Sequence, residues 1–178
     1  MTAGSSEASA LRGRVFRFGN DISTDLITAG RYMHLRKNLP ELAKHALEDA
    51  DPAFVQRVQP GDFVVAGTNF GMGSSREHAP LVLKLNGVAA VLAKSCARIF
   101  FRNAINIGLP VLICDTDRIG AGDTLRVDLE AALITDETTG EEISIGELPP
   151  VMLRILGEGG VKPFIRRYGS FDNVAQIT

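Results

Sequence analysis

The 178-residue sequence predicts one α/β domain in which helices flank a mixed β-sheet and the C-terminal part is rich in β-strands. Short apolar runs alternate with helix-like segments between Phe63 and Cys114, which is typical of strands joined by helical crossovers. Further along, polar and apolar residues alternate in short runs separated by turn residues, which indicates antiparallel strands. Apolar residues make up 45% of the chain and charged residues 22%, so a folded core is expected.

The individual elements follow from local patterns. Charged and apolar residues alternate at 14–18, which predicts the first strand, and leucines and alanines at helical spacing predict a helix at 39–50. Residues 32–37 have no clear period and are expected to form a loop. The other strands are expected at 63–67, 88–93, 111–115, 124–129, 132–135 and 142–145, and the other helices at 79–85, 96–107, 148–156 and 161–168.

Composition narrows the classes of protein. The small polar residues at 1–13 are expected to form a disordered lead, with 14–178 as a single domain. The N-terminus lacks the basic start and apolar segment of a secretory signal, and no apolar run reaches the roughly 18 residues of a membrane span. A net charge of −2 argues against a nucleic-acid surface. A cytoplasmic protein with no membrane or nucleic-acid partner is expected.

Cys96 and Cys114 are the two cysteines, and both lie beside apolar runs. They are therefore expected to be buried, reduced thiols. An iron–sulfur cluster takes about three or four cysteine ligands, so this chain cannot complete one alone. The three histidines also lack metal-ligand spacing, and no metal site is expected.

The stretch TNFGMGSSREHAPLVLKLN at 68–86 carries the main functional signal. A glycine-rich turn brings Ser74, Ser75 and Arg76 before a helix-like segment, where unpaired N–H groups and a guanidinium can bind an anion. The same residues have a structural interpretation, because Ser74-x-x-Glu77 matches a capping box. Upstream, NDISTDLI fits a turn built from Asx and hydroxyl side chains.

Three motifs occur in order: NDISTDLI, NFGMGSSREHAP and AKSCARIFFRNAINIGLPV. Together they resemble the family of 3-isopropylmalate dehydratase small subunits, the separately encoded swivelling domains of the aconitase superfamily. The resemblance implies a β/β/α swivelling domain and a hydro-lyase of leucine, and hence branched-chain amino acid, biosynthesis. It also implies a large-subunit partner that holds a [4Fe–4S] cluster, whose iron polarises the leaving hydroxyl, and a small hydroxy-dicarboxylate substrate.

The resemblance assigns roles to residues of the two central motifs. Ser74 would be the base, acting as an alkoxide, while Ser75 and Arg76 would hold a substrate carboxylate. Asp25 would be a catalytic carboxylate near the leaving hydroxyl. Asn103, with its neighbouring arginines, is expected to position the central turn or to contact the partner.

The resemblance also implies that substrate choice depends on a loop that faces the variable substituent of the substrate. This loop contains Tyr32, Met33, His34, Leu35 and Arg36. Met33 and Leu35 favour an apolar substituent, whereas His34 and Arg36 fit neither the isopropylmalate nor the homoaconitate pattern. A citramalate, dimethylmalate or homoaconitate type of hydro-lyase therefore stays open, as does a carboxylate-binding module without catalysis.

Overall fold

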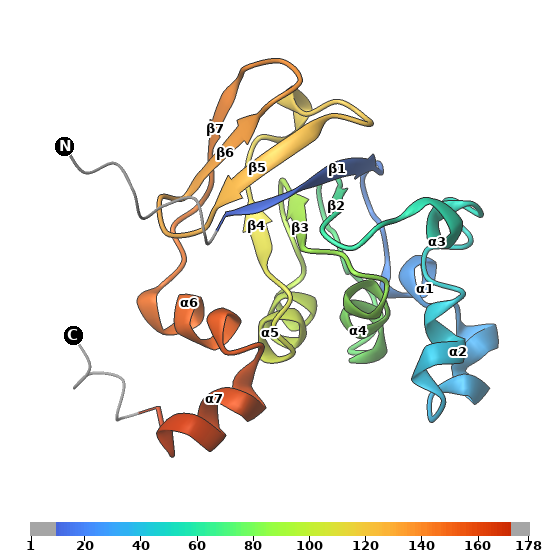
Figure 1. The fold of residues 1–178 in the computed structure, drawn as a ribbon. Coiled ribbons are helices and arrows are strands. Elements are labelled where there is room, and N and C mark those ends of the chain that lie inside the picture. The colour runs from blue at the N-terminus through green and yellow to red at the C-terminus, as the bar shows by residue number, and fades with distance from the viewer. Residues whose placement is uncertain (1–9, 172–178) are drawn as a thin grey trace.

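The computed structural model describes residues 10–171 and contains a seven-stranded mixed β-sheet (Figure 1). The strand order is β4-β3-β2-β1-β5-β6-β7. β1 to β4 are parallel, and β5 to β7 extend the sheet from β1 as antiparallel neighbours. The strands are β1 (Leu11–Arg17), β2 (Phe63–Val65), β3 (Ala90–Ala93), β4 (Val111–Ile113), β5 (Thr124–Asp128), β6 (Leu133–Asp136) and β7 (Glu142–Ser144). The predicted mixed sheet with a β-rich C-terminal part is confirmed.

Helices connect the parallel strands and follow the last strand. Figure 1 shows α4 and α5 packed below the parallel strands, with α6 and α7 beside α5. The helices are α1 (Thr24–Ile27), η1 (Gly30–Leu35), α2 (Leu39–Ala43), α3 (Phe54–Arg57), α4 (His78–Leu85), α5 (Arg98–Asn106), η2 (Thr116–Arg118), α6 (Pro150–Gly157) and α7 (Val161–Tyr168). Within residues 10–171, none of these helices is long and apolar enough to cross a membrane.

The parallel strands are buried on both faces. Val64 of β2 packs in a core shared with the helices, whereas its neighbours Phe63 and Val65 pack with Leu125 and Val127 of β5. Successive side chains of a strand point to opposite faces, so a strand between two cores must be apolar throughout. This arrangement explains the continuous apolar run that predicted β2.

The sheet curls until its two outer strands meet. Cys114, just after β4, forms an antiparallel bridge with Ile145, just after β7. The Gly146 N–H also donates a hydrogen bond of 2.9 Å to the Ile113 carbonyl. β4 and β7 are thus the ends of the strand order and are nevertheless in contact.

Three sequence predictions about the N-terminal third require correction. β1 begins at Leu11, so the boundary expected at 13/14 is wrong, while residues 1–9 of the predicted disordered lead lie outside the described residues. The expected loop at 32–37 is mostly the 3₁₀-helix η1. The predicted helix at 39–50 ends at Ala43, and turns follow. Leu47 has a positive φ of 55°, and its N–H donates to the Ile27 carbonyl (3.0 Å) instead of continuing a helix.

Candidate active site

Two loops at the carboxyl ends of β1 and β2 form the candidate site. Neighbouring parallel strands end at the same edge of a sheet, which is where α/β folds commonly bind ligands. Backbone hydrogen bonds join the two loops: Gly71 N–H donates to the Ile22 carbonyl (2.7 Å), and Thr24 N–H donates to the Met72 carbonyl (2.8 Å). The NDISTDLI and NFGMGSSREHAP motifs are therefore one structural unit.

Gly71 fixes the turn of the second loop against α5. Its φ is +74°, and a Cβ atom built there would lie 2.3 Å from Cγ of Phe100. The Phe100 ring is buried and packs edge-on against Phe70, with ring centroids 5.1 Å apart. Both the backbone conformation and the close approach require glycine at this position.

We expect Gly71→Ala to lower the free energy of unfolding by about 3 kcal/mol or more, because it combines a positive φ with overpacking. Urea unfolding of the isolated chain measures this. Gly140→Ala is a matched control, since Gly140 has φ +81° and no neighbouring atom within 4 Å of the added Cβ. Its cost should be only about 1–2 kcal/mol. Equal losses in the two variants would contradict the packing argument.

Ser74 is exposed but tied to a buried neighbour from the other loop. Its N–H donates to Oγ1 of Thr24 (3.1 Å), and its own Oγ lies 3.0 Å from the same oxygen. Thr24 is only 2% exposed. The Ser74 hydroxyl is therefore held at the surface by a fixed group beneath it.

The capping box predicted for Ser74 and Glu77 is wrong. α4 begins at His78, and Glu77 is its N-cap without a side-chain hydrogen bond. Ser74 and Ser75 lie in the turn before the helix and do not cap it. The hydroxyl of Ser74 contacts Thr24 instead of the helix backbone.

Arg76 and Asp25 form an ion pair across the two loops. Nη1 of Arg76 donates to Oδ1 of Asp25 and to the carbonyl of Thr28, both at 3.0 Å. The Gly30 N–H donates to the same carboxylate oxygen (2.9 Å). The hydrogen bond from Arg76, and then that from Gly30, lowers the pKa of Asp25 below its usual range. Asp25 is consequently an ionised acceptor at neutral pH.

The loop predicted to select the substrate packs largely on the protein itself. Tyr32 stacks on His45 with ring centroids 3.7 Å apart. Met33 and Leu35 are partly buried against the core shared with the helices. Their apolar character thus has a packing role within this chain.

The two remaining residues of this loop are more exposed. His34 is exposed, and its Nδ1 lies 3.0 Å from the Arg31 carbonyl. Arg36 is exposed at the C-terminal end of η1. His45 is half-buried beside Tyr32, and its Nδ1 lies 3.0 Å from Oε2 of Glu48.

Two further residues contact the site, and only Asn103 was expected to do so. Thr24 supports Ser74, and its only signal in the sequence is a hydroxyl beside Asp25. Asn103 of α5 donates through Nδ2 to the Ser75 carbonyl (3.3 Å). This hydrogen bond agrees with the first of the two roles expected for Asn103, positioning the central turn, and the expected contact with a partner stays a prediction.

The described residues do not fit an iron–sulfur cluster. Cys96 and Cys114 are both free thiols, as predicted. Cys114 is buried as expected, whereas Cys96 is only half-buried. Burial raises the pKa of each thiol to about 12, which disfavours the thiolate that a metal requires. Within residues 10–171, no three His, Cys, Asp or Glu side chains are grouped as metal ligands.

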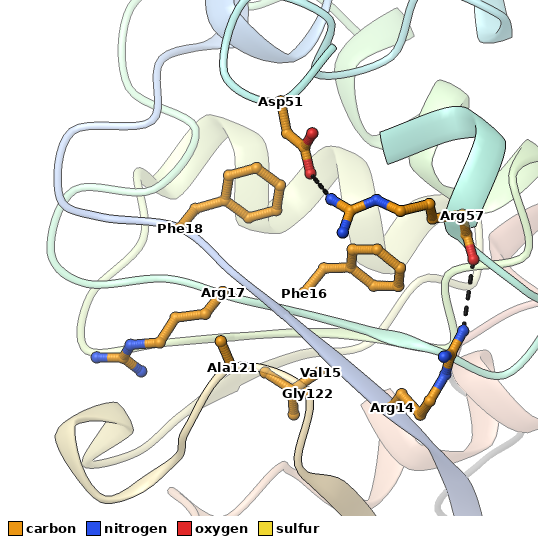
Figure 2. Close-up of a pocket in the computed structure, with 9 residues that line it drawn as sticks. All are labelled: Arg14, Val15, Phe16, Arg17, Phe18, Asp51, Arg57, Ala121 and Gly122. Atoms are coloured by element: carbon orange, nitrogen blue, oxygen red, sulfur yellow. Dashed lines mark hydrogen bonds and ion pairs between the residues drawn. The ribbon is translucent and has the colours of Figure 1, made fainter. Parts of the chain in front are cut away.

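A separate cavity of about 400 Å³ lies beside β1 (Figure 2). Phe16 and Phe18 project toward Arg57, and none of the predicted site residues lines the cavity. Its arginines already have acceptors: Arg57 pairs with Asp51, and Arg14 donates to the Arg57 carbonyl (3.5 Å). The cavity is therefore separate from the site on the two loops.

The fold and the two loops define an aconitase C-terminal domain, and the family model for that domain matches residues 20–115. The matched region contains both loops of the site. One relative is 63% identical to this chain over 88% of the length of this chain. The chain therefore belongs to the family of 3-isopropylmalate dehydratase small subunits. The family resemblance found in the three motifs is thereby confirmed.

The relatives cover almost the whole chain. That relative is 3-isopropylmalate dehydratase small subunit 2 of Archaeoglobus fulgidus, 95% of which is covered. Small subunit 1 of Thermotoga maritima is 53% identical over 92% of this chain and 99% of its own length. The isopropylmalate/citramalate isomerase small subunit of Methanocaldococcus jannaschii is 47% identical over 89% of this chain and 95% of its own length. A crystal structure of 3-isopropylmalate dehydratase from the same organism superposes with a TM-score of 0.85 at 40% identity, over 89% of this chain and 94% of that one.

Proposed function

We propose that this chain is the small subunit of a cytoplasmic hydro-lyase that interconverts 2-isopropylmalate and 3-isopropylmalate in leucine biosynthesis. The reaction would proceed by dehydration and rehydration and would require a large subunit. The observation that supports this most directly is the exposed Ser74 beside the Arg76–Asp25 pair, on two loops joined by hydrogen bonds. A base and a carboxylate-binding group at an open surface form half of an active site.

In this proposal Ser74 Oγ takes a proton from the carbon next to a substrate carboxylate. Arg76 binds that carboxylate, and Ser75 adds a hydroxyl donor. Asp25 and the Thr28 carbonyl both accept from Nη1 of Arg76, which fixes the plane of the guanidinium. The [4Fe–4S] cluster is assigned to the large subunit, because this chain has two cysteines and residues 10–171 contain no group of metal ligands.

Substrate choice within the family is the finer part of the proposal. We assign it to the loop of Tyr32, Met33, His34, Leu35 and Arg36. The partly exposed Met33 and Leu35 favour an apolar substituent on the malate. Citramalate is the second candidate, because a 47% identical relative is named an isopropylmalate/citramalate isomerase small subunit. An apolar pocket separates methyl-sized differences by only about 1–3 kcal/mol, so both substrates can be accepted.

Anaerobic co-expression with the large subunit tests the function. The purified complex should dehydrate 2- and 3-isopropylmalate, and neither subunit alone should do so. Assays with citramalate, dimethylmalate and homocitrate then rank the alternatives by kcat/KM. If the complex turned over another diacid but not isopropylmalate, the enzyme would belong to a different pathway. An isolated chain that binds a dicarboxylate but forms no complex would instead indicate a binding module.

A further inference from the structure

We propose that Thr24 is a positioning residue that holds Ser74 as a base by donating its hydroxyl proton to Ser74 Oγ. This inference rests on the proposed role of Ser74. The two hydroxyl oxygens are 3.0 Å apart, a normal distance for an O–H···O hydrogen bond. Thr24 comes from the loop after β1 and Ser74 from the loop after β2, so the pair exists only in the folded domain.

Thr24 can donate to Ser74, and an ionised Ser74 makes this the only possible direction. A hydroxyl has one proton to donate and two lone pairs to accept with. Thr24 Oγ1 already accepts from the Ser74 N–H at 3.1 Å, and its own proton stays available for Ser74 Oγ. An ionised Ser74 has no proton and can only accept. The bond then becomes O–H···O⁻, which is stronger and favours the ionised serine.

Thr24 is built to be immobile. Its side chain is buried, its N–H donates to the Met72 carbonyl (2.8 Å), and its carbonyl accepts from the Thr28 N–H (2.9 Å). A β-branched side chain also has few rotamers. Gly73 adopts φ +107°, and a Cβ there would approach Thr24 Oγ1 to 3.3 Å, so glycine keeps this oxygen uncrowded. A fixed donor beneath an exposed base lowers the reorganisation needed for proton transfer.

The test is the pH dependence of kcat in the reconstituted complex. Thr24→Val keeps the shape of the side chain and removes the donor. We expect its turnover at pH 7 to fall about 10- to 100-fold, as for the loss of one hydrogen bond to a charged group. The acid limb of the profile should move to higher pH by about 1–2 units, and activity should recover as the pH rises. A merely structural role would lower kcat equally at every pH.

Three further variants provide the controls. Thr24→Ser and Thr24→Ala both lose the methyl group and differ only in the hydroxyl. Only Thr24→Ala should therefore shift the pH profile. If Thr24→Val fails to assemble with the large subunit, this pair tests whether Thr24 acts as a donor. Thr116→Val removes a different buried hydroxyl, which donates to the Ala66 carbonyl at 2.7 Å. It should cost stability without moving the profile.

The outcomes separate this inference from the proposed function. A Ser74→Ala complex with normal turnover would overturn both. An inactive Ser74→Ala complex together with an unshifted profile in Thr24→Val and Thr24→Ala would overturn only the role of Thr24. Loss of turnover at all pH values in Thr24→Ser as well would also count against the donor role.

Discussion

Ser74→Ala should lower the turnover of the complex by about 10²–10⁴-fold, the range that a positioned general base contributes. The substitution removes the proposed proton acceptor and leaves the Ser74 N–H bond to Thr24 in place. Because Ser74 is exposed, the isolated chain should lose less than about 1 kcal/mol of stability. Single-turnover and steady-state assays of the complex, with urea unfolding of the subunit, measure the two effects.

Ser144→Ala is the matched control for this variant. Ser144 is also an exposed serine, but it lies in β7, in the antiparallel part of the sheet. Its turnover should stay within about two-fold of the wild type, as expected for a surface substitution away from the site. If Ser74→Ala retained comparable activity, the base would have to be another group.

Arg76→Lys should lower kcat/KM by about 10²-fold or more, although the positive charge is kept. Arginine can bond Asp25, the Thr28 carbonyl and a substrate carboxylate at once, because its planar group has five donors. A lysine ammonium is a single point charge and cannot hold all three in one plane. The loss should appear mainly in KM if Arg76 binds ground state and transition state equally, and in kcat otherwise.

Arg57→Lys provides the comparison for the arginine variant. Arg57 also pairs with an aspartate, Asp51, but it lines the separate cavity of Figure 2. Its replacement should change turnover by no more than about two-fold. Full activity in Arg76→Lys would mean that charge alone is sufficient at this position.

The strands were predictable because their signals are local. β2 and β3 are short apolar runs buried on both faces, and the last three strands alternate between core and solvent. The helix expected at 39–50 failed because tertiary contacts override its spacing. Leu47 donates its N–H to Ile27, and the Tyr32 ring stacks on His45, so the chain turns where the pattern continues.

The site was predictable in its residue types but not in its hydrogen bonds. The motifs identified Ser74, Arg76 and Asp25, and the last two form an ion pair. The local pattern Ser74-x-x-Glu77 suggested a helix cap, yet the partner of Ser74 is Thr24, 50 positions away in sequence. No periodicity or spacing can reveal a contact that depends on two strands lying side by side.

The contact between the segments that end β4 and β7 affects how much of the sheet edge is open to another chain. An open sheet edge is a template for pairing with another chain and a cause of aggregation. Here the strands at the two ends of the sheet bridge each other at Cys114 and Ile145. The bridge and the Gly146–Ile113 hydrogen bond occupy one end of both edges, so a second copy can pair only with the remaining part of either strand.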